Sequence, residues 1–173
     1  MNFRSQRMLL AATMAVFALS ACKASKEDEL KAWTANGAAV TTLGAKYPQF
    51  AALLKARVAS QQKAFDAAKA KEGKEAVAAM GAANKSVRAL LGPLQTYERK
   101  RERIIKLYND YKVRKNKGHK VRNARDKADK KLKQAAEVIL AAKPANDAEM
   151  LTALSQANGY LREGLQPLER LQR

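Results

Sequence analysis

Residues 84–111 read NKSVRALLGPLQTYERKRERIIKLYNDY, and their apolar spacing sets the architecture that we expect. The larger apolar side chains recur every three or four residues, which is the period of one face of an α-helix. Gly92-Pro93 interrupts the segment, and a proline inside a helix normally kinks or breaks it. Because the apolar positions keep one helical phase across the proline, we predict a nearly continuous helix over about residues 75–115, kinked at Gly92-Pro93. The positions in phase are Val87, Leu91, Leu94, Tyr97, Ile104, Tyr108 and Tyr111.

Four further helices are expected around this segment. Ser25 is suited to cap the first of them, Gly44 to end it, and Pro48 to occupy the first position of the next. The chain is therefore predicted to be all-α: a single domain over residues 26–173, with the form of an elongated antiparallel bundle. The predicted helices cover about residues 26–43, 48–71, 119–142 and 148–171.

The chain aligns with itself at an offset of 74 residues. The pattern Asn-x-x-Val-Arg-x-x-Leu-x-Pro-Leu at residues 84–94 matches Asn-x-x-Leu-Arg-x-x-Leu-x-Pro-Leu at residues 158–168 without a gap. We interpret the match as a duplicated αα-hairpin, preceded by the N-terminal helix, whose two units bury their apolar faces against each other. A chance match between Ala-, Lys- and Leu-rich helices is the alternative. Asn84 and Arg88 lie four residues apart, so they either interact or flank the core.

The first 21 residues have the form of an export signal. Arg4 and Arg7 precede an uncharged run at residues 8–21, MLLAATMAVFALSA. This run is too short to span a bilayer as a permanent helix, but it matches the apolar region of a secretory signal peptide. The run leads into Leu19-Ser20-Ala21-Cys22, which resembles the lipobox of bacterial lipoproteins.

This resemblance implies that residues 1–21 are removed and that Cys22 carries a lipid anchor in the bacterial cell envelope. Residues 22–25 would then be a short tether between the lipid and the helical domain. In enteric-type lipoproteins an Asp directly after the lipidated Cys is the inner-membrane retention signal. Because Lys23 stands at that position, the chain resembles an outer-membrane-directed lipoprotein that faces the periplasm. The inner membrane and the cell surface are the alternative locations. An ordinary signal peptide, or a buried helix with an incidental cysteine, is the alternative to the lipoprotein interpretation.

Most of the positive charge lies between residues 99 and 133. The whole chain has 34 Lys and Arg and 16 Asp and Glu, a formal net charge of +18. Residues 99–133 alone hold 16 basic residues against four acids, a net charge of +12. They flank the predicted turn Asn116-Lys117-Gly118, so the helices on either side would form a hairpin with a basic tip. The predicted anion-binding residues around this tip are Arg99, Arg103, Lys106, Arg114, Lys115, Lys117, Lys120, Arg122 and Lys127.

Such an excess of one charge favours an anionic partner, although a solvated helix face is the usual origin of a charge run. The export signal argues against nucleic acid. We therefore expect an anionic lipid, lipopolysaccharide, an acidic wall polymer or an acidic protein. Tyr97, Tyr108 and Tyr111 lie among the basic residues, but their helical phase places them in the core rather than on a base-stacking surface.

Residues that could support catalysis or bind a metal are scarce. One His and one Cys cannot build a four-ligand zinc site or an intramolecular disulfide. His119 has no nucleophile motif beside it, and the chain has no glycine-rich phosphate loop. We therefore predict no catalytic residue, no metal and no cofactor.

The leading hypothesis is a non-catalytic, lipid-anchored cell-envelope protein whose basic hairpin, Arg99–Lys133, binds an anionic partner. One alternative is a structural or assembly subunit of an envelope complex, recognised through helix packing. Another is a periplasmic helical chaperone or stress sensor.

Palmitate labelling tests the anchor. A bacterial host producing the chain in the presence of radiolabelled palmitate should incorporate label into it, and Cys22→Ala should abolish the labelling because no other thiol is present. The Ser20→Ala variant, which keeps a small residue before the cleavage point, should still be labelled. Label retained in Cys22→Ala would contradict the lipoprotein interpretation.

Overall fold

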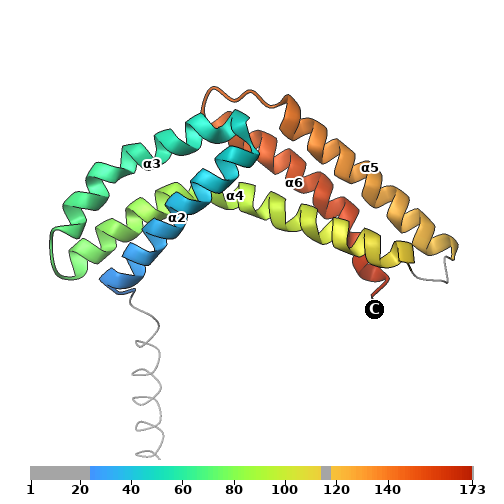
Figure 1. Ribbon diagram of the computed structural model, residues 1–173, viewed down its shortest axis with the longest axis horizontal. Helices are drawn as coiled ribbons and strands as arrows, with labels where there is room; N and C mark the ends of the chain where they lie inside the picture. Colours follow the sequence, from blue (N-terminus) through green and yellow to red (C-terminus); the bar gives the residue numbers. More distant parts are fainter. Residues whose placement is uncertain (1–23, 114–117, 173) are drawn as a thin grey trace, which may run out of the picture.

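The computed structural model describes residues 24–113 and 118–172. Within this part of the chain, five helices pack against one another and no strand is present (Figure 1). The all-α prediction is confirmed, whereas the predicted signal segment, Cys22 and Lys23 lie outside the described residues. The helices are α2 (Lys26–Lys46), α3 (Pro48–Lys69), α4 (Lys74–Val113), α5 (His119–Ala141) and α6 (Asp147–Arg170).

The central element is α4, whose 40 residues run through Pro93 without a break. Figure 1 shows α4 bent near its middle, so that the described helices form an arch. The helices α2 and α3 cover one half of α4, and α6 packs against the other half. The helix α4 therefore belongs to both halves of the molecule.

The helix α2 begins at its predicted cap but extends beyond its predicted end. The Ser25 hydroxyl accepts a hydrogen bond from the Asp28 N–H at 3.1 Å, and the Asp28 carboxylate accepts one from the Ser25 N–H at 3.0 Å. The expected end near residue 43 is wrong, because the helix continues through Gly44. Gly44 is buried, and a Cβ there would lie 3.4 Å from the Cβ of Ala51 in α3. Close packing between α2 and α3 thus outweighs the helix-ending tendency of glycine.

The core holds one large and one small group of buried apolar side chains. Tyr97 and Tyr111 are buried in the larger group, as their helical phase predicts, whereas Tyr108 is only partly buried. In the smaller group, Phe65 is buried and its ring stacks on that of Trp33, with centroids 4.2 Å apart. Side chains from α2, α3 and α4 together form this smaller group.

The buried positions follow the offset of 74 residues seen in the sequence. Every buried residue of α6 has a buried counterpart 74 residues earlier, in α4. Three of the four buried residues of α5 have a buried counterpart in α3 at the same offset. The α4/α6 pairs are Ala76/Met150, Met80/Leu154, Ala83/Ala157, Val87/Leu161, Leu90/Gly164 and Leu94/Leu168; the α3/α5 pairs are Phe50/Ala124, Leu54/Ala128 and Phe65/Ile139.

The helices α4 and α5 do not pack on each other as the predicted basic hairpin requires. They make little contact, because α6 lies between them and packs against both (Figure 1). Small side chains allow α5 and α6 to approach closely. A Cβ added at Gly164 would lie 3.0 Å from the Cβ of Lys131 and 3.5 Å from the Cα of Ala128.

Two glycines of α6 give a matched test of this packing. Gly164→Leu should lower the free energy of unfolding by about 1–3 kcal/mol, because its side chain would overfill the space between α5 and α6. Gly159→Ala should instead raise it by about 1 kcal/mol, because alanine favours a helix over glycine and an added Cβ meets nothing within 4 Å. Urea unfolding measures both variants. Equal effects of the two substitutions would contradict the close α5–α6 contact.

Candidate anion-binding surface

The predicted anion-binding residues fall on two helices. Three of them lie on the second half of α4 and three on the first half of α5. The other three, Arg114, Lys115 and Lys117, lie outside the described residues. The α4 residues are Arg99, Arg103 and Lys106, and the α5 residues are Lys120, Arg122 and Lys127.

The three α4 cations line one open groove with a volume of about 550 Å³. Gln172, just after α6, also lines this groove. Because carboxylates also line the groove, its walls have both signs of charge. The remaining lining residues are Glu102, Leu107 and Asp110.

These three cations differ in their pairing. Arg103 forms an ion pair with Glu169 of α6, with 2.7 Å between nitrogen and oxygen, and so helps to join α6 to α4. Arg99 donates a hydrogen bond to the Thr96 hydroxyl at 3.3 Å. Within residues 24–113 and 118–172, no carboxylate lies within 4 Å of the charged group of Arg99 or Lys106. We use the name free cations only for the predicted anion-binding residues that have no such carboxylate. Unpaired lysines elsewhere, such as Lys55 and Lys63 of α3, are not included in this set.

The three α5 cations are all exposed, and each is a free cation among the residues that the structure describes. Lys120 and Lys127 lie two helical turns apart and share one side of α5. Arg122 lies about 200° around the helix from Lys120, on another side. The free cations of α5 therefore lie on two sides of its first half instead of forming a single face.

Two cations that the sequence prediction did not single out have structural roles. The Arg125 guanidinium lies over the Tyr108 ring at 4.4 Å from its centroid, which links α5 to α4. Lys131 lies 4.9 Å from the centroid of the Tyr160 ring and forms an ion pair with Glu163 at 2.7 Å. The hydrogen bond and charge of Lys131 lower the pKa of Glu163. Sequence spacing does not reveal these contacts, because each joins residues of different helices.

Lys100 is the cation most affected by its surroundings. Burial and the nearby Arg162 lower the pKa of Lys100. Its ammonium group donates a hydrogen bond to the Asn158 carbonyl of α6 at 3.4 Å. The side chain of Asn158 donates in turn to the Pro93 carbonyl at 3.0 Å. This part of α6 is thereby attached to α4 at and just after the proline.

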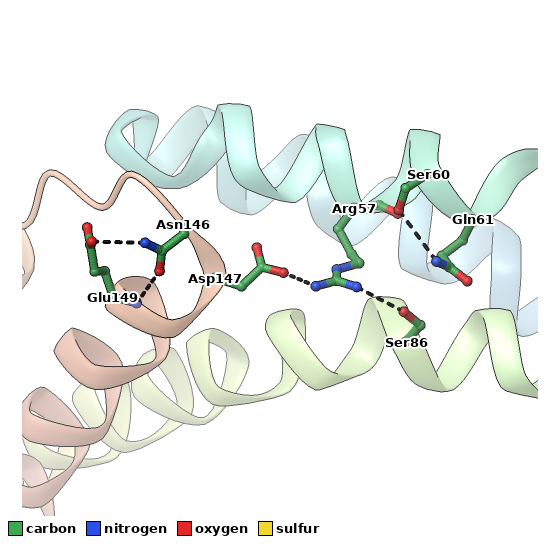
Figure 2. Close-up of polar contacts among 7 residues, drawn as sticks. All are labelled: Arg57, Ser60, Gln61, Ser86, Asn146, Asp147 and Glu149. Carbon is green, nitrogen blue, oxygen red and sulfur yellow. Dashed lines mark hydrogen bonds and ion pairs between the residues drawn. The ribbon is translucent and has the colours of Figure 1, made fainter.

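A polar junction connects the two halves of the arch. Figure 2 shows Arg57 of α3 between Ser86 of α4 and Asp147 at the start of α6. Its guanidinium donates to the Ser86 hydroxyl at 3.3 Å and forms an ion pair with the Asp147 carboxylate. In the same view, the Asn146 side chain caps α6 by accepting a hydrogen bond from the Glu149 N–H at 3.0 Å. Arg57 therefore joins three helices at the place where the two halves of the arch meet.

A second polar cluster joins α2 to α4. Asn36 donates to the side-chain oxygen of Asn84 at 2.8 Å, and Asn84 donates to the carboxylate of Glu29 at 2.7 Å. Arg88 donates to the side-chain oxygen of Asn36 at 3.4 Å. Asn84 and Arg88, which the sequence left as either interacting or flanking the core, are connected through Asn36 of another helix, which the repeat pattern did not indicate.

Few other features of the described residues bear on chemistry. His119 is exposed at the start of α5, and its Nδ1 lies 3.2 Å from the side-chain nitrogen of Asn123. The described residues contain no group of three or more His, Cys, Asp or Glu side chains arranged to bind a metal. No helix in the described ranges has the length and apolar character needed to cross a membrane. Comparisons with protein-family models, with curated proteins and with solved structures found no match for this chain.

The junction residue Arg57 can be tested against a neighbour on the same helix. Arg57→Ala should lower the free energy of unfolding by about 1–2 kcal/mol, because it removes a half-buried charged hydrogen bond. Lys55→Ala, at an exposed position of α3, should change it by less than about 0.5 kcal/mol. Chemical denaturation measures both. A loss in Lys55→Ala as large as that in Arg57→Ala would argue against the junction.

Proposed function

We propose that this chain is a non-catalytic, lipid-anchored cell-envelope protein that binds an anionic envelope component through its free cations. The observation that carries the proposal is the position of these cations. They lie on the second half of α4 and the first half of α5, in the half of the arch away from the N-terminal end of α2 (Figure 1). The lipid anchor would attach at that N-terminal end, so the anchor and the basic end would be separate.

The distribution of charge along the chain supports this assignment. Residues 134–157, which include the connection between α5 and α6, hold one Lys and three acids, a net charge of −2. Residues 99–133 hold a net charge of +12. Since like charges crowded on neighbouring helices repel, the basic end costs stability unless a partner neutralises it.

We also propose that the helical domain contains a duplicated αα-hairpin. One unit is α3 with the first half of α4, and the other is α5 with α6. Support comes from the offset of 74 residues, which relates both the Asn-x-x-x-Arg pattern and the buried positions of the two units.

Charge reversal in α5 tests the proposed binding. The mature chain without Cys22 should bind anionic vesicles, lipopolysaccharide or acidic wall polymer better than neutral vesicles. Reversing Lys120, Arg122 and Lys127 to Glu should weaken that binding by on the order of 100-fold at low salt, since each cation near an anionic surface contributes about 1 kcal/mol. Sedimentation with each anion at several salt concentrations measures the effect.

The matched control reverses three exposed lysines away from the basic end, Lys55, Lys63 and Lys143. It has the same net charge as the test variant and should retain most of the binding. Equal losses in the two triple variants would show that only net charge matters and would contradict a localised site. Binding to an envelope component that survives both reversal and high salt would favour the alternative, an assembly subunit recognised through helix packing.

A further inference from the structure

We propose that the protein contacts one membrane at two points. The lipid on Cys22 would hold one end of the arch, and the free cations at the α4–α5 end would bind anionic phospholipid headgroups of the same bilayer. This inference rests on the proposed lipid anchor. It identifies the anionic component as lipid, in preference to a polymer or an acidic protein.

The first contact follows from the length of the tether. Ala24 is the second residue after Cys22, so the two Cα atoms are at most about 7 Å apart. Ala24 also lines an open, largely apolar groove with a volume of about 540 Å³, together with Val77, Ala78 and Gly81 of α4. A lipid on Cys22 would therefore bring an apolar part of the folded domain to the bilayer surface.

The shape of the molecule brings the second contact to the same side. In Figure 1 the N-terminal end of α2 and the C-terminal end of α6 both emerge on the concave side of the arch. Gln172, just after α6, lines the groove that contains Arg99 and Lys106, which places this groove near the second end of the arch. The helix α4 connects the two ends with 40 residues, about 60 Å along its axis. A flat surface can thus meet both ends without a change in the fold.

The arrangement of the free cations favours lipid over a structured partner. Arg99 and Lys106 lie on α4, whereas Lys120 and Arg122 lie on different sides of α5. A rigid protein partner would need carboxylates arranged to match these scattered positions. Lipid headgroups diffuse within the bilayer and can gather around cations in any arrangement. The net charge of −2 on residues 134–157 would also direct that part of the chain away from an anionic surface.

A single fluorescent label can report the distance between the second end and the bilayer. Cys22 is the chain's only cysteine, so lipidation leaves no free thiol and an introduced cysteine is labelled alone. Gln172→Cys places the dye beside the basic groove. Leu140→Cys places it on the last turn of α5, where Leu140 is 77% exposed. In Figure 1 this end of α5 lies on the convex side of the arch. The full lipidated chain is reconstituted into phosphatidylcholine vesicles with or without phosphatidylglycerol, and energy transfer to a lipid-bound acceptor is measured.

Phosphatidylglycerol should increase energy transfer from position 172 and leave transfer from position 140 unchanged or lower. High salt should remove the increase. Neutralising Arg99, Lys106 and Lys120 to Gln should reduce the ratio of docked to undocked molecules by on the order of 100-fold, since each cation contributes about five-fold. Neutralising Lys55, Lys63 and Lys143 to Gln changes the net charge equally and should leave the increase in place.

The possible failures are distinguishable. A chain that does not float with pure phosphatidylcholine vesicles lacks the lipid anchor, which overturns both the proposed function and the two-point contact. A chain that floats, but shows equal transfer from position 172 with and without phosphatidylglycerol, keeps its anchor and overturns the second contact. If that chain binds a soluble acidic polymer in a salt-dependent manner instead, the proposed function stands and the membrane is not the partner.

Discussion

The continuity of α4 through Pro93 holds the two ends of the molecule in a fixed relation. Pro93 has no N–H, so the carbonyl of Ala89 loses its usual helical donor and the helix bends. The helix survives because the turns around the proline are anchored, with Leu91 and Leu94 both fully buried. The Asn158 side chain then binds the Pro93 carbonyl and attaches α6 at this place. The bend of one helix therefore determines how the α2–α3 end is oriented relative to the α5–α6 end.

Polar groups reinforce this fixed arrangement where the two halves of the molecule meet. Glu98, one turn beyond the proline, is buried and accepts hydrogen bonds from Lys46 and from the Tyr47 hydroxyl at the corner between α2 and α3. A buried carboxylate is costly without partners, so these contacts favour one position of the corner along α4. Arg57 acts similarly on the other side, because it reaches both α4 and the start of α6. The apolar core stabilises the helices against one another, and these polar contacts select one arrangement of them.

Local sequence signals predicted the helices, but not how the helices pack. Ser25 and Pro48 marked helix starts because capping and proline geometry depend on adjacent residues alone. The helix end predicted at Gly44 was wrong because the role of this glycine depends on a residue of a neighbouring helix, which local signals do not include. The position of α6 between α4 and α5 could not be predicted, because the basic segment suggested a hairpin by chain order alone. The pairs Arg57–Asp147 and Asn36–Asn84 are separated by 90 and 48 residues, and periodicity within one helix contains no information about them.

The candidate site was predictable as a region, and the structure separates its cations by role. Arg103 and Lys131 are held in ion pairs with α6, and Arg125 lies on an aromatic ring, so these three stabilise the fold. Lys106 and Lys120 have no such partner among the described residues. Free cations on different helix faces do not fit a single rigid anionic surface. The choice among anions would therefore depend on which of them lie close to the protein. A short tether of the kind proposed here would restrict that reach to one membrane surface and raise the effective concentration of its headgroups. The specificity of such a protein would then come from where it is held, with charge supplying the contact.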